Sequence, residues 1–304
     1  MLLVTDLKKV SLVPFTVLCI ALATSLSTRA ADKDALRILQ QSLTFHASFN
    51  HGIDADFAKG DHRLFTCLKP GNQSTAQPGL NTNQKTERLP SQGVSGGALQ
   101  FKARDAKWIF FPGARNVNFT PHDWSGTLSV WLKLDPEEDL DPGFTDPIQI
   151  TPRKWNDAAF FIDFDKDGDP RDFRLGAFAD LSVWNAKNEN VNDIPESKRP
   201  LAKVTAPPFG RQKWTHVVFT WEHFNTGKKD GISKLYLDGK LQGEIKNWQQ
   251  TFSWSADEEV RIFLGINYIG LLDEVSIFDR ALSGQQIQEL FKLNDQISLI
   301  VPKH

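Results

Sequence analysis

The sequence has few sulfur-containing residues, with 2 Cys and 1 Met among 304 residues. Cys19 lies in an apolar N-terminal segment that we expect to be removed, which leaves Cys67 alone. A single cysteine can form no disulfide within the chain and no cysteine-based metal site. We therefore expect the mature fold to be held by its core, with or without a bound ion.

The sequence also lacks an excess of charge of either sign. Its 35 Lys and Arg residues face 37 Asp and Glu residues, which gives a formal net charge of −2. This balance provides no basic surface for a nucleic acid, so we expect no such partner. Aromatic rings are abundant instead, with 22 Phe and 9 Trp beside only 2 Tyr. So many rings exclude a disordered chain and favour an all-β protein, because aromatic side chains suit a pleated sheet.

Only one long hydrophobic run is present, and it resembles the core of a secretory signal peptide. Lys8 and Lys9 precede the uncharged segment 11–26, and a Thr-Arg-Ala sequence ends at Ala30. The run is short for a membrane span of about 20 residues and contains a proline. We expect residues 1–30 to be a signal peptide that is cleaved, leaving no membrane span. The protein is then secreted and extracytoplasmic, either periplasmic or extracellular; an uncleaved anchor is the alternative.

The rest of the sequence alternates apolar and polar residues with the period of two that is typical of β-strands. Residues 43–49 show it first, and an Asp-Gly turn predicts a hairpin over residues 234–245. Further strands are expected at residues 98–103, 107–111, 127–134, 158–164, 173–178, 214–221, 261–265 and 271–278. Residues 71–93 are polar and rich in Gly, Pro and Asn, which predicts a long surface loop.

One helix is expected near the C-terminus, because Ser283 and Gln286 have the spacing of a capping box. We find no internal repeat and no linker that would divide domains. The sequence therefore predicts a lead-in segment at residues 31–42, one domain at residues 43–293 and a tail at residues 294–304. Many short strands with turns between them argue for a single β-sandwich.

Five segments, taken in order, resemble laminin-G-like domains of the concanavalin A-like lectin/glucanase superfamily. They are residues 93–101 (GVSGGALQF), 127–133 (TLSVWLK), 214–217 (WTHV), 235–239 (LYLDG) and 270–283 (GLLDEVSIFDRALS). The resemblance implies a jelly-roll sandwich of two antiparallel sheets with a short C-terminal helix. It leaves the function open, since this fold hosts lectins, adhesion modules and hydrolases.

The sequence lacks the E-x-D-x-x-E pattern with which glycosidases of this superfamily place their carboxylates on one strand. Double displacement needs two carboxyl groups about 5 Å apart, and alternate positions of one strand supply such a pair. We therefore expect no enzymatic activity. A polysaccharide hydrolase or lyase with an unrecognised site, using the acidic turn at residues 163–172, is an alternative.

Calcium could bind at two places. Asp163, Asp165 and Asp167 put carboxylates at alternate positions, as calcium loops do, although a solvated hairpin turn explains them as well. The family resemblance implies a structural calcium ion where the first strand meets the closing strand, at Asn50 and Asp273. Asp273 shares a face with apolar side chains, so an ion or backbone N–H groups must satisfy its carboxylate.

Five tryptophans are expected in or beside loops: Trp124, Trp155, Trp184, Trp248 and Trp254. An exposed indole can stack on a sugar ring, although each of these rings could instead close an end of the sandwich. We therefore expect a non-catalytic domain that binds carbohydrate, a polysaccharide or a cell-surface glycan. An interaction or adhesion module with a protein partner is the alternative.

Overall fold

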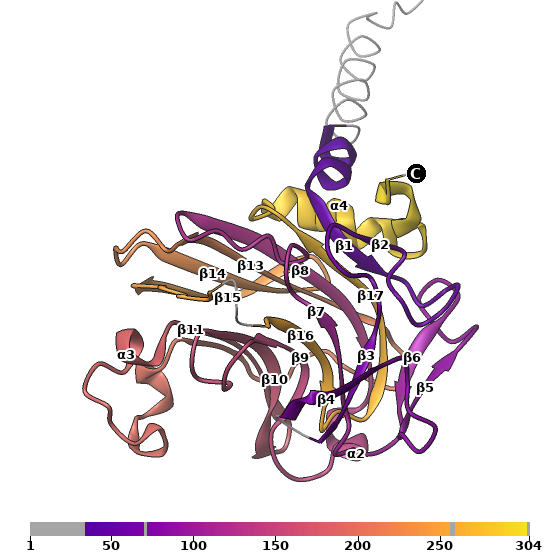
Figure 1. Cartoon of the computed structure of the whole chain (residues 1–304), viewed down its shortest axis with the longest axis horizontal. Coiled ribbons are helices and arrows are strands. Elements are labelled where there is room, and N and C mark those ends of the chain that lie inside the picture. Colours follow the sequence, from indigo (N-terminus) through magenta and orange to yellow (C-terminus); the bar gives the residue numbers. More distant parts are fainter. Residues whose placement is uncertain (1–33, 70–71, 256–258, 303–304) are drawn as a thin grey trace, which may run out of the picture.

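The computed structural model describes residues 34–69, 72–255 and 259–302. The predicted signal peptide and residues 31–33 lie outside the described residues, as do the last two residues of the predicted tail. The described chain forms two antiparallel sheets packed face to face, with a helix near the C-terminus (Figure 1). This jelly-roll sandwich confirms the predicted fold class.

One sheet has nine strands, and its main order is β15-β14-β13-β8-β17-β1-β2, with β6 beside β17 and β5 beside β6. The strands are β1 Leu43–Ala47, β2 Phe57–Ala58, β5 Thr86–Leu89, β6 Ala98–Phe101, β8 Trp124–Lys133, β13 Thr215–Phe224, β14 Gly231–Leu237, β15 Lys240–Trp248 and β17 Gly270–Phe278. The predicted hairpin joins β14 to β15. Asp238 and Gly239 both have positive φ there (48° and 74°), as this type of two-residue turn requires.

The other sheet has eight strands in the order β12-β11-β10-β9-β16-β7-β3-β4. The strands are β3 Phe65–Lys69, β4 Asn72–Pro78, β7 Trp108–Pro112, β9 Thr145–Thr151, β10 Ala159–Gly168, β11 Arg171–Phe178, β12 Leu201–Val204 and β16 Arg261–Ile266. Strands β10 and β11 flank the acidic turn, as their sequences predict.

The helices are short. Residues 34–42 are helical, followed by α2 Pro136–Asp139, α3 Leu181–Trp184, α4 Gly284–Leu293 and the 3₁₀ turns η1 Val191–Asp193, η2 Glu196–Lys198 and η3 Asn294–Ile300. The predicted capping box of α4 is present, with Ser283 and Gln286 each bonded to the other's backbone N–H. No helix in the described part of the chain is long and apolar enough to cross a membrane.

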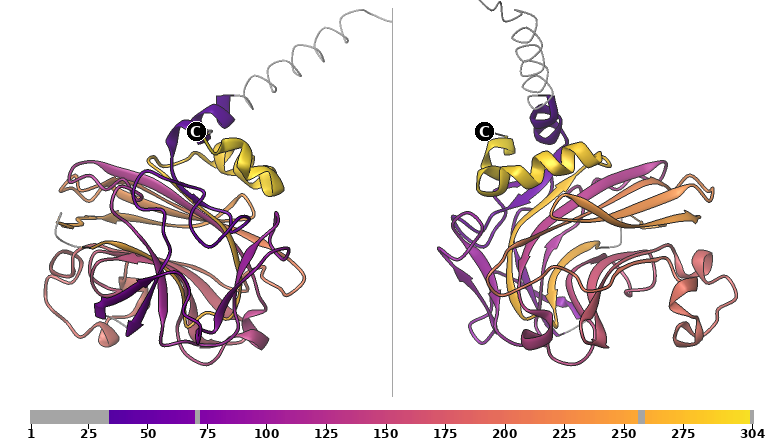
Figure 2. Two further views of the ribbon diagram at one scale, coloured as in Figure 1. Left: turned by 45° about the vertical axis from the view of Figure 1, so that its right-hand side comes forward. Right: turned by 180° about the vertical axis from the view of Figure 1, so that it is seen from behind.

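The main core lies between the two sheets. Leu128, Val130 and Leu132 of β8 face this core, as their alternation predicts, and meet apolar side chains of the eight-stranded sheet. Trp131, on the opposite face of β8, packs under α4 and stacks on Phe291 with ring centroids 5.7 Å apart. Helix α4 therefore covers the outer face of the nine-stranded sheet (Figure 2). In the predicted tail, Ile297 and Ile300 are buried against the same cluster.

The prediction of one long loop over residues 71–93 is wrong. Strands β4 and β5 lie within this segment, each at an edge of its sheet. A strand at an edge can expose polar residues on its free side, so it needs no alternating apolar pattern. The polar composition of residues 71–93 therefore gave no indication of either strand.

A matched pair of glycine substitutions tests the packing of this core. A Cβ atom at Gly126 would lie 2.1 Å from Cζ2 of the buried Trp221, whereas a Cβ atom at Gly284 would meet nothing within 4 Å. We expect Gly126→Ala to lower the free energy of unfolding by about 1–3 kcal/mol. Gly284→Ala should raise it slightly, because alanine favours the first turn of α4. Urea unfolding measures both changes, and equal effects would contradict this account of the core.

Candidate functional site

Three of the five tryptophans predicted near loops are internal or strand residues. Trp124 begins β8 and Trp248 ends β15, so both lie beside loops as expected, although within the ends of strands. Trp124 is only 1% exposed and lies edge-to-face against six rings, with centroids 5.1–6.3 Å apart. Trp254 is also buried, and its Nε1 donates to the carbonyl of Ala158 at 2.9 Å. Neither buried indole offers a face to a ligand.

Trp184, at the end of α3, lies at the margin of the protein. Its Nε1 donates to the carbonyl of Asn156 at 2.8 Å, and its ring lies edge-to-face on Phe178 at 4.9 Å. Trp248 is half-buried between the main core and this marginal cluster. Both rings serve the packing of the loop that follows β11.

Among the residues that the structure describes, Trp155 is the one exposed tryptophan, at 42%. Its ring rests edge-to-face on Phe161 and Phe178, with centroids 6.1 and 5.5 Å away. These two phenylalanines project from β10 and β11 on the outer face of the eight-stranded sheet, away from the main core. The backing rings hold the indole in place, so Trp155 can present an apolar surface to a ligand.

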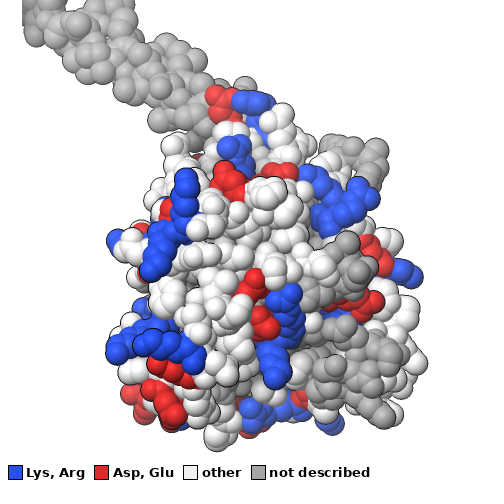
Figure 3. Space-filling view, turned by 60° about the vertical axis from the view of Figure 1, so that its left-hand side comes forward, with Lys and Arg blue, Asp and Glu red and all other residues white. Residues whose placement is uncertain are grey.

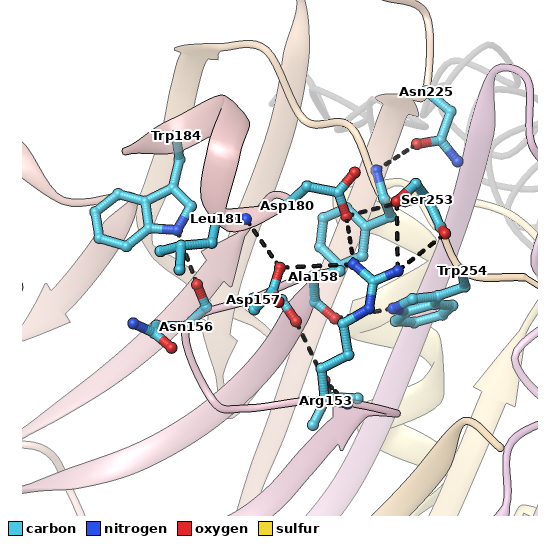
Figure 4. Close-up of polar contacts among 12 residues, drawn as sticks. Arg153, Asn156, Asp157, Ala158, Asp180, Leu181, Trp184, Asn225, Ser253 and Trp254 are labelled. Carbon is cyan, nitrogen blue, oxygen red and sulfur yellow. Dashed lines mark hydrogen bonds and ion pairs between the residues drawn. The ribbon is translucent and has the colours of Figure 1, made fainter. Parts of the chain in front are cut away.

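A pocket of about 430 Å³ is lined by neighbours of Trp155 in the same loop and by residues of two other loops. Its lining is Arg153, Asp157, Asp180, Leu181, Ser182, Asn185, Ala186, Asn188 and Ser253. Three chain connections meet here: β9 to β10, β11 to α3, and the segment after β15 (Figure 4). The pocket therefore forms only when the sandwich is assembled.

Arg153 organises the pocket. Its Nη1 lies 3.0 Å from Oδ1 of Asp180 and 3.6 Å from Oδ1 of Asp157, and its Nη2 donates to the carbonyl of Ser253 at 3.1 Å (Figure 4). Asp157 also accepts the N–H of Leu181 at 2.9 Å. The result is a fixed set of carboxylate, guanidinium and amide groups that can both accept and donate hydrogen bonds.

The sequence analysis missed these polar residues. Arg153, Asp157, Asp180 and Ser253 lie up to 100 positions apart, and none of them belongs to a recognisable motif. The only local signal is the Arg-Lys-Trp-Asn-Asp stretch at 153–157, which brings two polar pocket residues to either side of the exposed indole.

The acidic turn does not gather its carboxylates around one point. Asp163 is buried, and both its oxygens accept hydrogen bonds from Arg174. Asp165 lies 3.6 Å from the same guanidinium, and Asp167 points into solvent beside Lys166. The charge of Asp163 is therefore compensated by Arg174, which stands where a calcium loop of the EF-hand type would have a glutamate.

Asn50 and Asp273 come together as predicted, around the glycine-rich loop at residues 93–97. Oδ1 of Asn50 accepts the N–H of Gly97 at 2.6 Å, and Oδ2 of Asp273 accepts the N–H of Val94 at 2.8 Å. Oδ1 of Asp273 accepts the N–H of Glu274. Backbone N–H groups thus occupy the directions that a calcium ion would need, and the donor set does not fit calcium. In the described part of the chain, no three His, Cys, Asp or Glu side chains are placed to hold a metal.

A second buried acid follows Asp273 on β17. Burial, together with the charge of Asp273, raises the pKa of Glu274 to about 9. Burial lowers the pKa of His46, whose Nε2 lies 3.4 Å from Oε2 of Glu274, to about 4. At neutral pH both partners are therefore uncharged, and the contact is a neutral one despite its ion-pair geometry.

The comparison with family models agrees with this architecture. The model of the laminin G type in the concanavalin A-like lectin/glucanases superfamily matches residues 108–288, more than half of the chain. The chain belongs to this family. A comparison with curated proteins finds no match. The matched residues of this laminin G domain run from β7 into α4 and include every residue of the Arg153 pocket.

Solved structures show the same fold. Domain 4 of AbnA, a GH43 extracellular arabinanase from Geobacillus stearothermophilus, in complex with arabinotriose, has a TM-score of 0.50 and 19% identity, covering 82% of this chain and 98% of that domain. The binding domain of Paraclostridial Mosquitocidal Protein 1 has a TM-score of 0.50 and 14% identity, over 83% of this chain and 52% of that one. The laminin G domain thus spans about half of the second structure. Identities this low show a shared fold only.

The buried acid predicts how stability depends on pH. Because the pKa of Glu274 is raised from 4.5 to about 9, the folded state keeps a proton that the unfolded chain releases. Its contribution to stability is complete below pH 4.5 and is lost as the pH rises towards 9. We expect Glu274→Gln, which cannot ionise, to stabilise the protein by up to about 3 kcal/mol at pH 7 and by little at pH 4.

Urea unfolding at pH 4, 7 and 8 measures this effect. The exposed Glu189 provides the control, because Glu189→Gln should change stability by a similar small amount at every pH. A gain for Glu274→Gln that does not depend on pH would contradict a protonated Glu274.

The calcium hypothesis has its own test. A ligand that binds only the native state raises the melting temperature. Because N–H groups already face Asn50 and Asp273, we expect equal melting temperatures in excess chelator and in about 5 mM CaCl₂, which is about 5,000 times a Kd of 1 μM. A melting temperature that rises with calcium in the wild type but not in Asp273→Asn would instead show that a calcium ion binds at Asp273.

Proposed function

We propose that this laminin G domain binds carbohydrate outside the cytoplasm and does not cleave it. The observation that carries the proposal is the exposed indole of Trp155, which Phe161 and Phe178 back and which belongs to the same loop as Arg153 and Asp157 of the pocket. The other tryptophans are buried or half-buried, so the binding hypothesis narrows from five rings to one.

Stacking on Trp155 supplies the apolar part of recognition. The C–H face of a sugar ring can cover an indole and remove its surface from water, which favours binding by roughly 25 cal/mol per Å². Because Phe161 and Phe178 already hold the indole, little side-chain freedom is lost when a ligand binds. The ring is therefore a prepared platform.

The pocket supplies the polar part. Sugar hydroxyls both donate and accept, and the carboxylates of Asp157 and Asp180 accept while the amide of Asn188 does both. The face shown in Figure 3 carries positive and negative side chains intermingled, which suits an uncharged ligand better than a polyanion. A domain of the same fold has been solved with arabinotriose, which supports a saccharide as the ligand.

The same geometry argues against hydrolysis in this pocket. Glycosidases leave the space between their two carboxyl groups to the scissile bond. Here Nη1 of Arg153 lies between Asp157 and Asp180, in contact with both. A catalytic pair would need that space, so we infer a binding role. The secreted location rests on the signal-peptide pattern of residues 1–30.

A substitution of Trp155 tests the proposal. We expect wild-type protein to bind at least one member of a polysaccharide panel in affinity electrophoresis, and Trp155→Ala to weaken that binding about tenfold or more, equivalent to about 1.4 kcal/mol. Trp155→Phe keeps a ring and should retain part of the affinity. Leu241→Ala, which removes another exposed apolar side chain, is the control and should bind as wild type.

Two outcomes would contradict the proposal. Folded protein that binds no polysaccharide in the panel would argue for a protein partner, whose binding free sugars do not inhibit. Release of reducing ends from a bound polysaccharide, lost in Asp157→Asn or Asp165→Asn, would establish a hydrolase instead.

A further inference from the structure

A second pocket lies on the opposite side of the protein, on the outer face of the nine-stranded sheet. It has a volume of about 490 Å³ and lies between β13, β14 and the start of α4, the helix that crosses this face in Figure 2. Its lining is Thr220, Glu222, Lys234, Tyr236, Arg280, Ala281, Leu282, Ser283, Gly284 and Gln286. None of these residues takes part in the Arg153 pocket.

Two residues with little exposed surface bring hydroxyl groups to this second pocket. Thr220 is 2% exposed and Tyr236 is 6% exposed, yet neither side chain forms a hydrogen bond with any residue that the structure describes. Both hydroxyl groups line the pocket, so a ligand or water there can complete their hydrogen bonds. Burial raises the pKa of Tyr236, so its hydroxyl stays protonated and can donate.

Positive charge dominates the rim. Nζ of Lys234 lies 3.1 Å from Oε1 of Glu222, which compensates one cation. Arg280 is exposed and forms no ion pair or side-chain hydrogen bond with the described residues, so one guanidinium remains free. The pocket thus holds two cations and one carboxylate.

The first turn of α4 adds further donors. The capping box uses the N–H groups of Ser283 and Gln286. It leaves the N–H groups of Gly284 and Gln285 without a partner within the helix, at the positive end of its dipole. A Cβ atom at Gly284 would meet nothing within 4 Å, so the approach to these N–H groups is open.

We propose that this pocket binds the oxyanion group of a small ligand: a carboxylate, sulfate or phosphate. Tyr236 and Thr220 donate from the floor, Arg280 and Lys234 compensate the charge, and the N–H groups of α4 complete the site. Helix N-termini bind such groups because unpaired N–H groups and the dipole act together. The inference is independent of the proposed sugar site, which lies on the other sheet.

Isothermal titration with four probes tests the site: sodium sulfate, inorganic phosphate, glucuronate and glucose. Glucuronate and glucose share a ring and differ in one carboxylate. We expect at least one anionic probe to bind, and glucose to bind this pocket at least tenfold more weakly than glucuronate. Binding of sulfate or phosphate but not glucuronate would assign the tetrahedral anion, and the reverse result would assign the carboxylate.

Substitutions then locate the binding. Arg280→Gln and Tyr236→Phe should each weaken it about fivefold or more, whereas Arg115→Gln, the same charge change at an exposed arginine outside both pockets, should leave it unchanged. Trp155→Ala should also leave it unchanged, which separates this site from the sugar site. Arg280 is exposed and Tyr236→Phe removes one oxygen, so both variants are expected to fold.

The substitution Glu222→Gln should change the affinity in opposite directions for an anionic ligand and for a cationic one. It removes the one carboxylate of the lining and its ion pair with Lys234, so the affinity for an anion should rise at least twofold even though Glu244 still acts on Lys234. Weaker binding in Glu222→Gln would mean that the carboxylate itself holds a cation or a hydroxylated ligand, and would overturn the proposal. So would glucose binding as tightly as glucuronate, or no binding of any anionic probe at 10 mM (a free energy weaker than about −3 kcal/mol).

Discussion

The packing of aromatic rings between the two sheets holds the end of the sandwich where the sugar-binding pocket is proposed. Trp124 lies at the centre of this packing, against Phe160, Trp221 and Trp254. Without a disulfide, these buried rings must fix the ends of the strands. The nearby indole N–H groups then fix the loop: Trp254 bonds to Ala158 and Trp184 to Asn156, on either side of Asp157. Trp254 and Trp184, which the sequence suggested as sugar-binding residues, therefore position the loop that exposes Trp155.

Buried carboxyl groups impose a second constraint, because each needs hydrogen-bond donors, a compensating charge or a proton. Strand β17 pairs with β1, β6 and β8, so Asp273 and Glu274 are carried into the interior with it. N–H groups of the glycine-rich loop bond to Asp273, and retention of a proton removes the charge of Glu274. Asp163 meets the same cost of burial in a different way, through Arg174. Hydrogen bonds, a retained proton and an ion pair are thus three ways in which this fold accommodates a buried carboxyl group.

The sequence predicted the elements whose signal is local. Alternation at 127–134, the Asp-Gly turn and the Ser283 capping box each report the conformation of a few adjacent residues, and all three were confirmed. Strands β4 and β5 escaped prediction because edge strands need no apolar alternation. Strand β8 begins at Trp124, three residues before the predicted start at residue 127, and Gly126 is required there because the Trp221 ring approaches the backbone.

The sequence by itself determined the all-β class and the laminin G relationship, because composition and ordered motifs are properties of the chain alone. Only the tertiary structure decided which tryptophan is exposed and which polar groups surround it. Arg153, Asp180 and Ser253 become neighbours when three separate connections meet at one end of the sandwich. The exposure of each tryptophan likewise depends on which side chains the rest of the fold covers, and the residues next to it in the sequence do not indicate this.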